Sequence, residues 1–374
     1  MRESLLIVGA SVRAAAQSAA RLGLLPVCGD LFGDADLPDA CVGRVARSFP
    51  GDLVRIAEEV PAGPWMYTGG LENHPRVVAK ISRRRELLGN SPATLRGVRD
   101  PFILGRVLVD AGFLFPECRE SSDGLPRDGR WLRKQRRASG GLRVERWSGK
   151  CGSSDARGSY YQRYLDGLPL GVVYIAAAGR ARLVGVSEQI VTGTPQAPFR
   201  YGGSIAPLTL PPPQREYLSA LGDVLALQFD LRGLFGVDLI LAAEGLWAIE
   251  VNPRYTASVE LFERAFSFNA IELHLAACRD GRLPDSTTKP QARWHGKSIL
   301  YSGRSQRVPS AVTSALCGLN ASGAWPAVAD IPRAGTDIAP GQPVVTVFAE
   351  AADRSALQVE LARRTEQVRA LLGG

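Results

Sequence analysis

Residues 236–254 constrain the fold of this chain most, because they read as two apolar strands joined by a tight turn. The segment runs Gly-Val-Asp-Leu-Ile-Leu-Ala-Ala-Glu-Gly-Leu-Trp-Ala-Ile-Glu-Val-Asn-Pro-Arg. Ile240 and Ile249 suit strands, and Glu244-Gly245 stands where a hairpin needs its turn. The sequence therefore predicts a β-hairpin that carries acidic and amide side chains.

The predicted hairpin brings three oxygen-bearing side chains together. Asp238 and Glu250 would lie near each other across the ladder, and Asn252 would share the face of Glu250 because side chains alternate with period two. Mg²⁺ prefers oxygen ligands, usually one or two carboxylates completed by water and phosphates. We therefore expect these three residues to bind Mg²⁺ or Mn²⁺. Arg254 follows a proline and is expected to act in catalysis, facing a phosphoryl group or an oxyanion. The alternative is an ordinary hairpin with two solvated acids and a surface arginine.

The hairpin sequence resembles a known family. Residues 236–238 and 249–254 are similar to the metal-binding strands of ATP-grasp enzymes, and residues 255–260, Tyr-Thr-Ala-Ser-Val-Glu, resemble their branch of predicted carboligases related to biotin carboxylase. The resemblance covers most of the chain. It implies an α/β (α+β) ATP-grasp fold and ATP as co-substrate.

The same resemblance implies three domains. A Rossmann-like pre-ATP-grasp domain is expected over residues 1–95, and the ATP-grasp nucleotide-binding and catalytic domain over 96–290. A small β-rich domain with a terminal helix is expected over 291–374. A length of 374 residues suits two or three domains that share a cleft.

Composition narrows the classes of function. With 45% apolar and 22% charged residues, and no apolar run near the roughly 18 residues of a membrane span, we expect a cytoplasmic protein without membrane contact. The net charge of +8 is mostly arginine, and its densest cluster, residues 127–137, lacks an aromatic-interleaved motif, so we expect anionic small molecules and not nucleic acid. Six scattered cysteines without a Cys-x-x-Cys pair indicate a reducing compartment and no structural zinc.

A lysine and a glycine-rich loop suggest where the phosphates bind. Lys134 lies on a short predicted strand, residues 131–135, and the loop Ala-Ser-Gly-Gly follows at 138–141. The lysine supplies charge and bare backbone N–H groups supply close donors. In sequence order this matches the phosphate lid of the family. We expect Lys134, Ser139, Gly140 and Gly141 to bind ATP, and Lys134 also to act in catalysis.

Two further nucleotide contacts follow from the resemblance. Residues 160–167 form a strand that ends in an Asp-Gly turn and resemble the adenine hinge of the family, which implies ATP contacts at Gln162, Arg163, Tyr164 and Asp166. A plain edge strand is the alternative. The family often places a nucleotide-contacting lysine just before the helix predicted from residue 100; here Pro101 occupies that place, and Arg99 is the candidate substitute.

The N-terminal region predicts strand, turn, helix and strand from residue 4 onward. Its turn does not match the Gly-x-Gly-x-x-Gly fingerprint of dinucleotide-binding proteins. Ser11 and Arg13 at the helix start, and Glu72 where a strand end opens onto a loop, are candidate substrate contacts. The alternative is a domain that only packs.

Two helices are predicted further along the chain, one over residues 211–229 and one over residues 258–278. His274, on the second, is expected as a core residue.

The resemblance implies an ATP-dependent carboxylate–amine ligase. A substrate carboxylate would attack the γ-phosphate to give an acylphosphate, and an amine would then displace phosphate to form an amide. The natural expectation is that an amino acid is joined to a small metabolite or cofactor precursor, by a protein that forms homodimers, the common default. A bicarbonate-using carboxylase and a non-catalytic ATP-binding regulatory protein are the alternatives.

Overall fold

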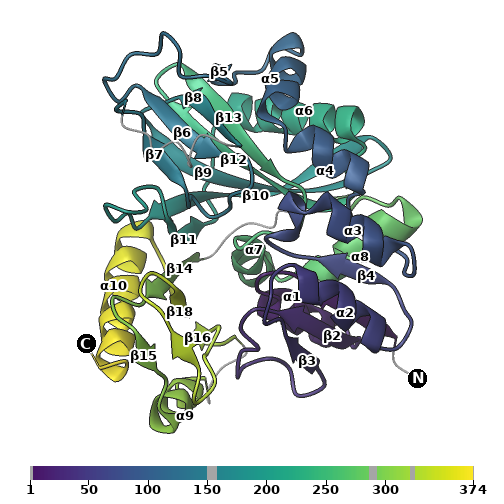
Figure 1. Ribbon diagram of the computed structural model, residues 1–374, viewed down its shortest axis with the longest axis vertical. Helices are drawn as coiled ribbons and strands as arrows, with labels where there is room; N and C mark the ends of the chain where they lie inside the picture. The colour runs from purple at the N-terminus through teal and green to yellow at the C-terminus, as the bar shows by residue number, and fades with distance from the viewer. Residues whose placement is uncertain (1–2, 150–157, 286–292, 321–324, 374) are drawn as a thin grey trace.

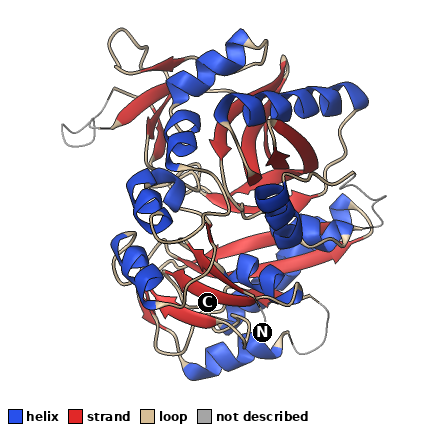
Figure 2. Ribbon diagram, turned by 90° about the vertical axis from the view of Figure 1, so that its right-hand side faces the viewer, coloured by secondary structure: helices blue, strands red, loops and turns tan. Residues whose placement is uncertain are grey.

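The computed structural model describes residues 3–149, 158–285, 293–320 and 325–373 (Figure 1). Helices and strands occur in comparable amounts, which confirms the expected α/β (α+β) class (Figure 2). The elements between about residue 92 and residue 252 form an upper lobe, and below it the N-terminal region and the region after residue 293 lie on opposite sides, right and left in Figure 1. Within the described ranges, no helix combines the length and apolar character that a membrane span requires.

A four-stranded parallel sheet forms the N-terminal region, with strand order β3-β2-β1-β4. The predicted strand, turn, helix and strand are confirmed. Buried apolar residues such as Leu6, Val8 and Trp65 hold the sheet against its helices. The elements are β1 (Ser4–Val8), α1 (Arg13–Arg21), β2 (Leu25–Asp30), β3 (Val42–Val45), α2 (Gly51–Glu59), β4 (Trp65–Tyr67), the short helix η1 (Leu71–Asn73) and α3 (Pro75–Ser82).

Two helices and a small sheet follow. Helix α4 (Pro92–Val98) and helix α5 (Pro101–Asp110) both begin with proline, as the sequence predicted for α5, and the side chains of Ser91 and Asp100 cap them. The small antiparallel sheet has the order β5-β8-β6-β7. Its strands are β5 (Cys118–Arg119), β6 (Trp131–Gln135), β7 (Val144–Arg146) and β8 (Ser159–Arg163).

An eight-stranded antiparallel sheet, in the order β13-β12-β9-β10-β11-β14-β18-β16, is the centre of the molecule. Helix α6 (Pro212–Phe229), predicted from the sequence, covers one face, beneath which the rings of Tyr174 and Phe235 stack at 4.9 Å. Strands from beyond residue 293 continue this sheet. The strands are β9 (Leu168–Ala177), β10 (Arg180–Val191), β11 (Tyr201–Ala206), β12 (Gly233–Ala242), β13 (Gly245–Asn252), β14 (Trp294–Tyr301), β16 (Val328–Ala329) and β18 (Pro343–Ala351).

The single helix predicted over residues 258–278 is wrong in one respect, because two helices occupy this stretch. Helix α7 (Val259–Phe266) ends where Ser267 takes a left-handed conformation, and α8 (Ala270–Asp280) begins with its N-cap at Asn269. His274 is buried, as expected. The remaining elements are β15 (Gln306–Arg307), α9 (Ser310–Gly318), β17 (Asp337–Ile338) and α10 (Arg354–Leu371).

Candidate ATP and metal site

The predicted hairpin is present as β12 and β13, and its register sets the geometry of the site. Asp238 pairs directly with Glu250 across the ladder, with a β-bulge after Asp238. Both carboxylates line a cavity of ≈ 280 Å³. Most of the predicted site residues line it too: Lys134, Ser139, Gly140, Gly141, Gln162, Arg163, Tyr164, Asn252 and Arg254. The structure therefore brings together side chains from β6, β8, β12, β13 and the loop after β6.

The two carboxylates differ in their charge environment. Asp238 accepts hydrogen bonds from Gln189 Nε2 at 2.7 Å and from Asn252 Nδ2 at 2.9 Å. Burial and the facing Glu250 carboxylate raise the pKa of Asp238 to about 6. Burial also acts to raise the pKa of Glu250, but the charges of Arg99 and Lys134 outweigh it and lower that pKa. Two half-buried carboxylates that face each other are a place where an added cation relieves repulsion.

Two arginines lie at this acidic pair, and Arg99 binds one of its carboxylates. Arg99, at the C-terminus of α4, donates to Glu250 Oε1 and, at 3.2 Å, to the carbonyl oxygen of Val251. Arg254 Nη2 donates to Asn252 Oδ1 at 3.1 Å and to Glu72 Oε1 at 2.9 Å. Arg99 therefore stands beside the metal-ligand candidates and lines the same cavity.

The donor set fits a hard divalent cation. Asp238 and Glu250 offer carboxylate oxygens and Asn252 an amide oxygen, and Mg²⁺ typically takes one or two carboxylates and completes its shell with water and phosphate oxygens. In the described part of the chain, no group of three or more His, Cys, Asp or Glu side chains is arranged to hold a metal. The hairpin set therefore offers two carboxylates and one amide oxygen, a donor set that leaves positions for water and phosphate oxygens.

Lys134 and the glycine loop line the same cavity. Lys134 Nζ is buried and donates to Gln162 Oε1 at 3.0 Å. Burial acts to lower the pKa of Lys134, but Tyr160 and Glu250 outweigh it and raise that pKa, so the group is a cation at neutral pH. Gly141 has a φ of +71°, and a Cβ there would lie 1.8 Å from the carbonyl oxygen of Phe199. Only glycine fits this close approach.

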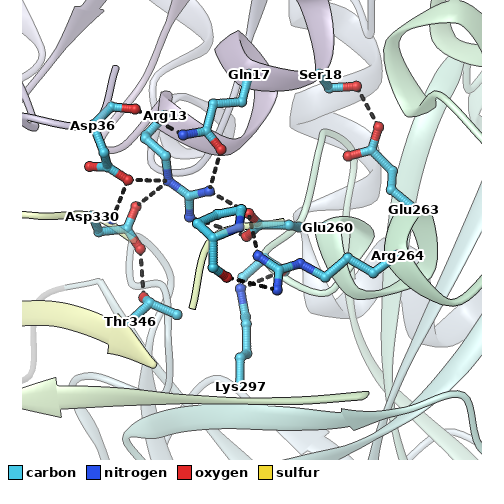
Figure 3. A network of polar contacts seen from close by, with 12 residues as sticks. Arg13, Gln17, Ser18, Asp36, Glu260, Glu263, Arg264, Lys297, Asp330 and Thr346 are labelled. Atoms are coloured by element: carbon cyan, nitrogen blue, oxygen red, sulfur yellow. Dashed lines mark hydrogen bonds and ion pairs between the residues drawn. The ribbon is translucent and has the colours of Figure 1, made fainter. Parts of the chain in front are cut away.

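Four of the predicted residues lie outside the cavity lining. Asp166 is exposed on the turn after β8, and Ser11 is exposed at the start of α1. Arg13 is 2% exposed and is fully engaged with Glu260, Asp330 and other partners (Figure 3). In the described structure Arg13 therefore joins α1 to α7 and to the segment after β16, and it does not face the cavity.

Glu72, the fourth, is 1% exposed and contacts the site indirectly. Its Oε1 accepts from Arg254 Nη2 and, at 3.2 Å, from Ser139 Oγ. Asn73 Nδ2 donates to the same Ser139 hydroxyl at 2.9 Å. Glu72 and Asn73 thus position the arginine and the glycine loop from the N-terminal region. The contact partners Gln189 and Asn73 had no role assigned from the sequence.

Comparison with known proteins agrees with this geometry. Residues 98–258 match the family model described as ATP-grasp domain. The resemblance to ATP-grasp proteins is confirmed, and with it the ATP-grasp fold.

Several solved structures share the fold over nearly the full chain. An L-amino acid ligase from Bacillus licheniformis is 15% identical with a TM-score of 0.71, covering 98% of this chain and 97% of that one. Biotin carboxylase from Campylobacter jejuni is 14% identical with a TM-score of 0.70, covering 96% and 90%. N5-carboxyaminoimidazole ribonucleotide synthetase from Thermus thermophilus is 18% identical with a TM-score of 0.69, covering 97% and 98%. At these identities the likeness establishes the fold.

Proposed function

We propose that this protein is an ATP-dependent carboxylate–amine ligase that forms an amide through an acylphosphate, joining an amino acid to a small metabolite or cofactor precursor. One observation carries the proposal: Asp238 and Glu250 share a single cavity with Arg254 and with the Lys134 strand and its glycine loop. The fold is shared with an L-amino acid ligase and, to a similar degree, with biotin carboxylase, so it supports both amide formation and the carboxylase alternative.

The nucleotide is held by charge and by backbone donors. Lys134 and the N–H groups of Gly140 and Gly141 bind the phosphates, and the chain from Gln162 to Tyr164 borders the adenine. Asp238, Glu250 and Asn252 would hold Mg²⁺, which neutralises phosphate charge when bound. Because Arg99 contacts Glu250, we propose that it takes the place of the missing lysine beside these phosphates.

The chemistry needs positioning and charge stabilisation. An oxygen of the substrate carboxylate attacks the γ-phosphorus and ADP leaves, so the substrate becomes an acylphosphate. The amine nitrogen then attacks the acyl carbon, phosphate leaves, and the nitrogen loses a proton. Arg254, oriented by Glu72 at 2.9 Å, stabilises the negative charge that develops on the transferred group.

Closure of the glycine loop protects the intermediate from water. Ser139 on this loop contacts both Glu72 and Asn73, so the loop lies against the N-terminal region. A loop that closes the cavity in this way excludes water from a reactive acylphosphate.

Phosphate release from MgATP tests the proposal. Pools of carboxylic acids and of amino acids are added in pairs, with Glu250→Gln as the blank, since that variant removes a metal ligand at nearly constant volume. We expect release that needs both a carboxylic acid and an amine. Release with bicarbonate alone would favour a carboxylase instead, and tight ATP binding without any release would favour a regulatory protein.

Isotope transfer tests the intermediate. With an ¹⁸O-labelled carboxylate of the active substrate, attack on the γ-phosphorus moves one label into the released phosphate. Product formation with unlabelled phosphate would contradict the acylphosphate route.

A further inference from the structure

Two cysteines of the N-terminal region lie in direct contact although 13 residues separate them. Cys28 is on β2, and Cys41 stands immediately before β3. The parallel pairing of the two strands places Cys28 opposite Gly43, and a turn in which the Cys41 N–H donates to Pro38 at 2.7 Å brings Cys41 back over it. The two Sγ atoms are 2.6 Å apart, inside the about 3.5–4.0 Å at which non-bonded heavy atoms pack.

The two thiols differ in access. Cys28 is 1% exposed and belongs to the apolar core that includes Val12, whereas Cys41 is half-buried at the rim of that core. The contact with Cys41 and burial raise the pKa of the Cys28 thiol well above its usual range. A reagent from solution therefore meets Cys41 first, and Cys28 stands behind it.

The chain between the cysteines fastens two distant parts of the protein. Asp36 accepts from the backbone N–H groups of Asp330 at 3.1 Å and Ile331 at 2.8 Å, and the Ala35 N–H donates to the Ile331 carbonyl oxygen at 2.7 Å. Asp36 also lies beside Arg13 in the network of Figure 3. We call residues 31–40 the clip, because they tie the N-terminal sheet to the segment after β16.

We propose that Cys28 and Cys41 are a redox-active pair that forms a reversible disulfide at the base of this clip by exchange with a low-molecular-weight disulfide. The Cys41 thiolate attacks one sulfur of the reagent, which releases one thiol and leaves a mixed disulfide. The Cys28 thiol loses its proton and attacks Cys41 Sγ, which releases the second thiol. The protein gives up two electrons and two protons, and the reagent takes them up as two thiols.

Preorganisation drives the second step. Because Cys28 Sγ already touches Cys41 Sγ, ring closure needs no chain rearrangement, and its effective concentration far exceeds that of an external thiol. The bond also closes the loop that holds Asp36 against residues 330–331. Loop closure restricts the unfolded chain, so the oxidised protein should unfold at a higher temperature than the reduced one.

Peptide mapping of the full-length protein, equilibrated with oxidised glutathione and digested without reduction, tests the pair. We expect one cross-linked peptide joining Cys28 to Cys41, a mass loss of two hydrogens and a Tm that falls when dithiothreitol is added. Cys317→Ser, at an exposed cysteine, is the control and should keep the cross-link. Cys41→Ser should lose it and leave Cys28 unmodified behind the core.

Two results would overturn the proposal. One is stable glutathione adducts on Cys41, or both thiols free, in the folded wild-type protein at saturating oxidised glutathione. The other is a cross-link that joins a different pair of cysteines. Both results are measured on the wild-type protein, so the proposal can be tested even if the Cys41→Ser variant does not fold.

Discussion

Replacing Arg99 by glutamine should destabilise the protein by an amount that the structure lets us bound. The guanidinium bridges Glu250 on β13, Asn73 in the N-terminal region and the carbonyl oxygen of Ala138 before the glycine loop. Its side chain is 11% exposed and that of Glu250 is 28% exposed. Removing one partner of a fully buried ion pair costs about 3–5 kcal/mol, and since water reaches Glu250 in part, we expect about 2–3 kcal/mol.

Thermal unfolding at pH 7 to 8 measures this loss. An unfolding entropy of about 2.1 cal/mol/K per residue gives about 0.8 kcal/mol/K for 374 residues, so Tm should fall by about 3–4 °C. Arg96→Gln, at an exposed arginine on the same helix, is the matched control and should change the stability by less than about 0.5 kcal/mol. Because Arg99 lowers the pKa of Glu250, the pair stabilises the protein above the unfolded carboxyl pKa and its contribution fades as pH falls through the folded pKa. An Arg99→Gln protein as stable as the Arg96→Gln control at pH 7 would refute the reasoning.

Three further outcomes are expected. Lys134→Ala should weaken ATP binding about 10- to 100-fold, as loss of a hydrogen bond to a charged group does, and calorimetric titration that finds an unaltered affinity would count against the phosphate assignment. Gly141→Ala should bind ATP about tenfold more weakly than Gly140→Ala. Both glycines have a positive φ, but only at position 141 would a Cβ collide with the Phe199 carbonyl oxygen. Equal ATP affinities of the two variants would contradict this packing. Burial lowers the pKa of His274 to about 4, against about 6.5 in the unfolded chain, so between these pH values only the unfolded chain binds the extra proton. Lowering the pH from 7 to 5 should therefore reduce the free energy of unfolding by about 2 kcal/mol. In denaturant titrations His274→Gln should lack this loss, and the same loss in both proteins would show that other groups cause it.

The hairpin could be predicted because its information is local. Alternation of apolar residues gives the strands, Glu244-Gly245 gives the turn, and together they pair Asp238 with Glu250 as the register shows. The helix boundary near Ser267 was missed for a related reason. Apolar spacing continues through it, and the two helices are separated by the left-handed Ser267 and by the cap at Asn269, whose side chain accepts from the Glu272 N–H.

Contacts between distant segments could not be predicted in the same way. Arg13 was predicted as a substrate contact because a charged side chain at the start of a helix often binds a ligand. Its partners Glu260 and Asp330 lie 247 and 317 positions away in the sequence. Likewise, six scattered cysteines gave no sign that Cys28 meets Cys41, since that contact depends on how β3 pairs with β2. Glu72 gained its relation to Arg254 through a contact across 182 positions.

Binding of Mn²⁺ in the presence of ADP, followed by electron paramagnetic resonance, tests most directly whether the β12–β13 hairpin is the metal–nucleotide site. The wild-type protein should bind Mn²⁺ with ADP. Glu250→Gln should lose more affinity than the about 10- to 100-fold that loss of a residue supporting a metal ligand costs, while its Tm stays within a few degrees of wild type. Equal Mn²⁺ affinity in the two proteins would contradict the assignment of Asp238, Glu250 and Asn252 as the metal site.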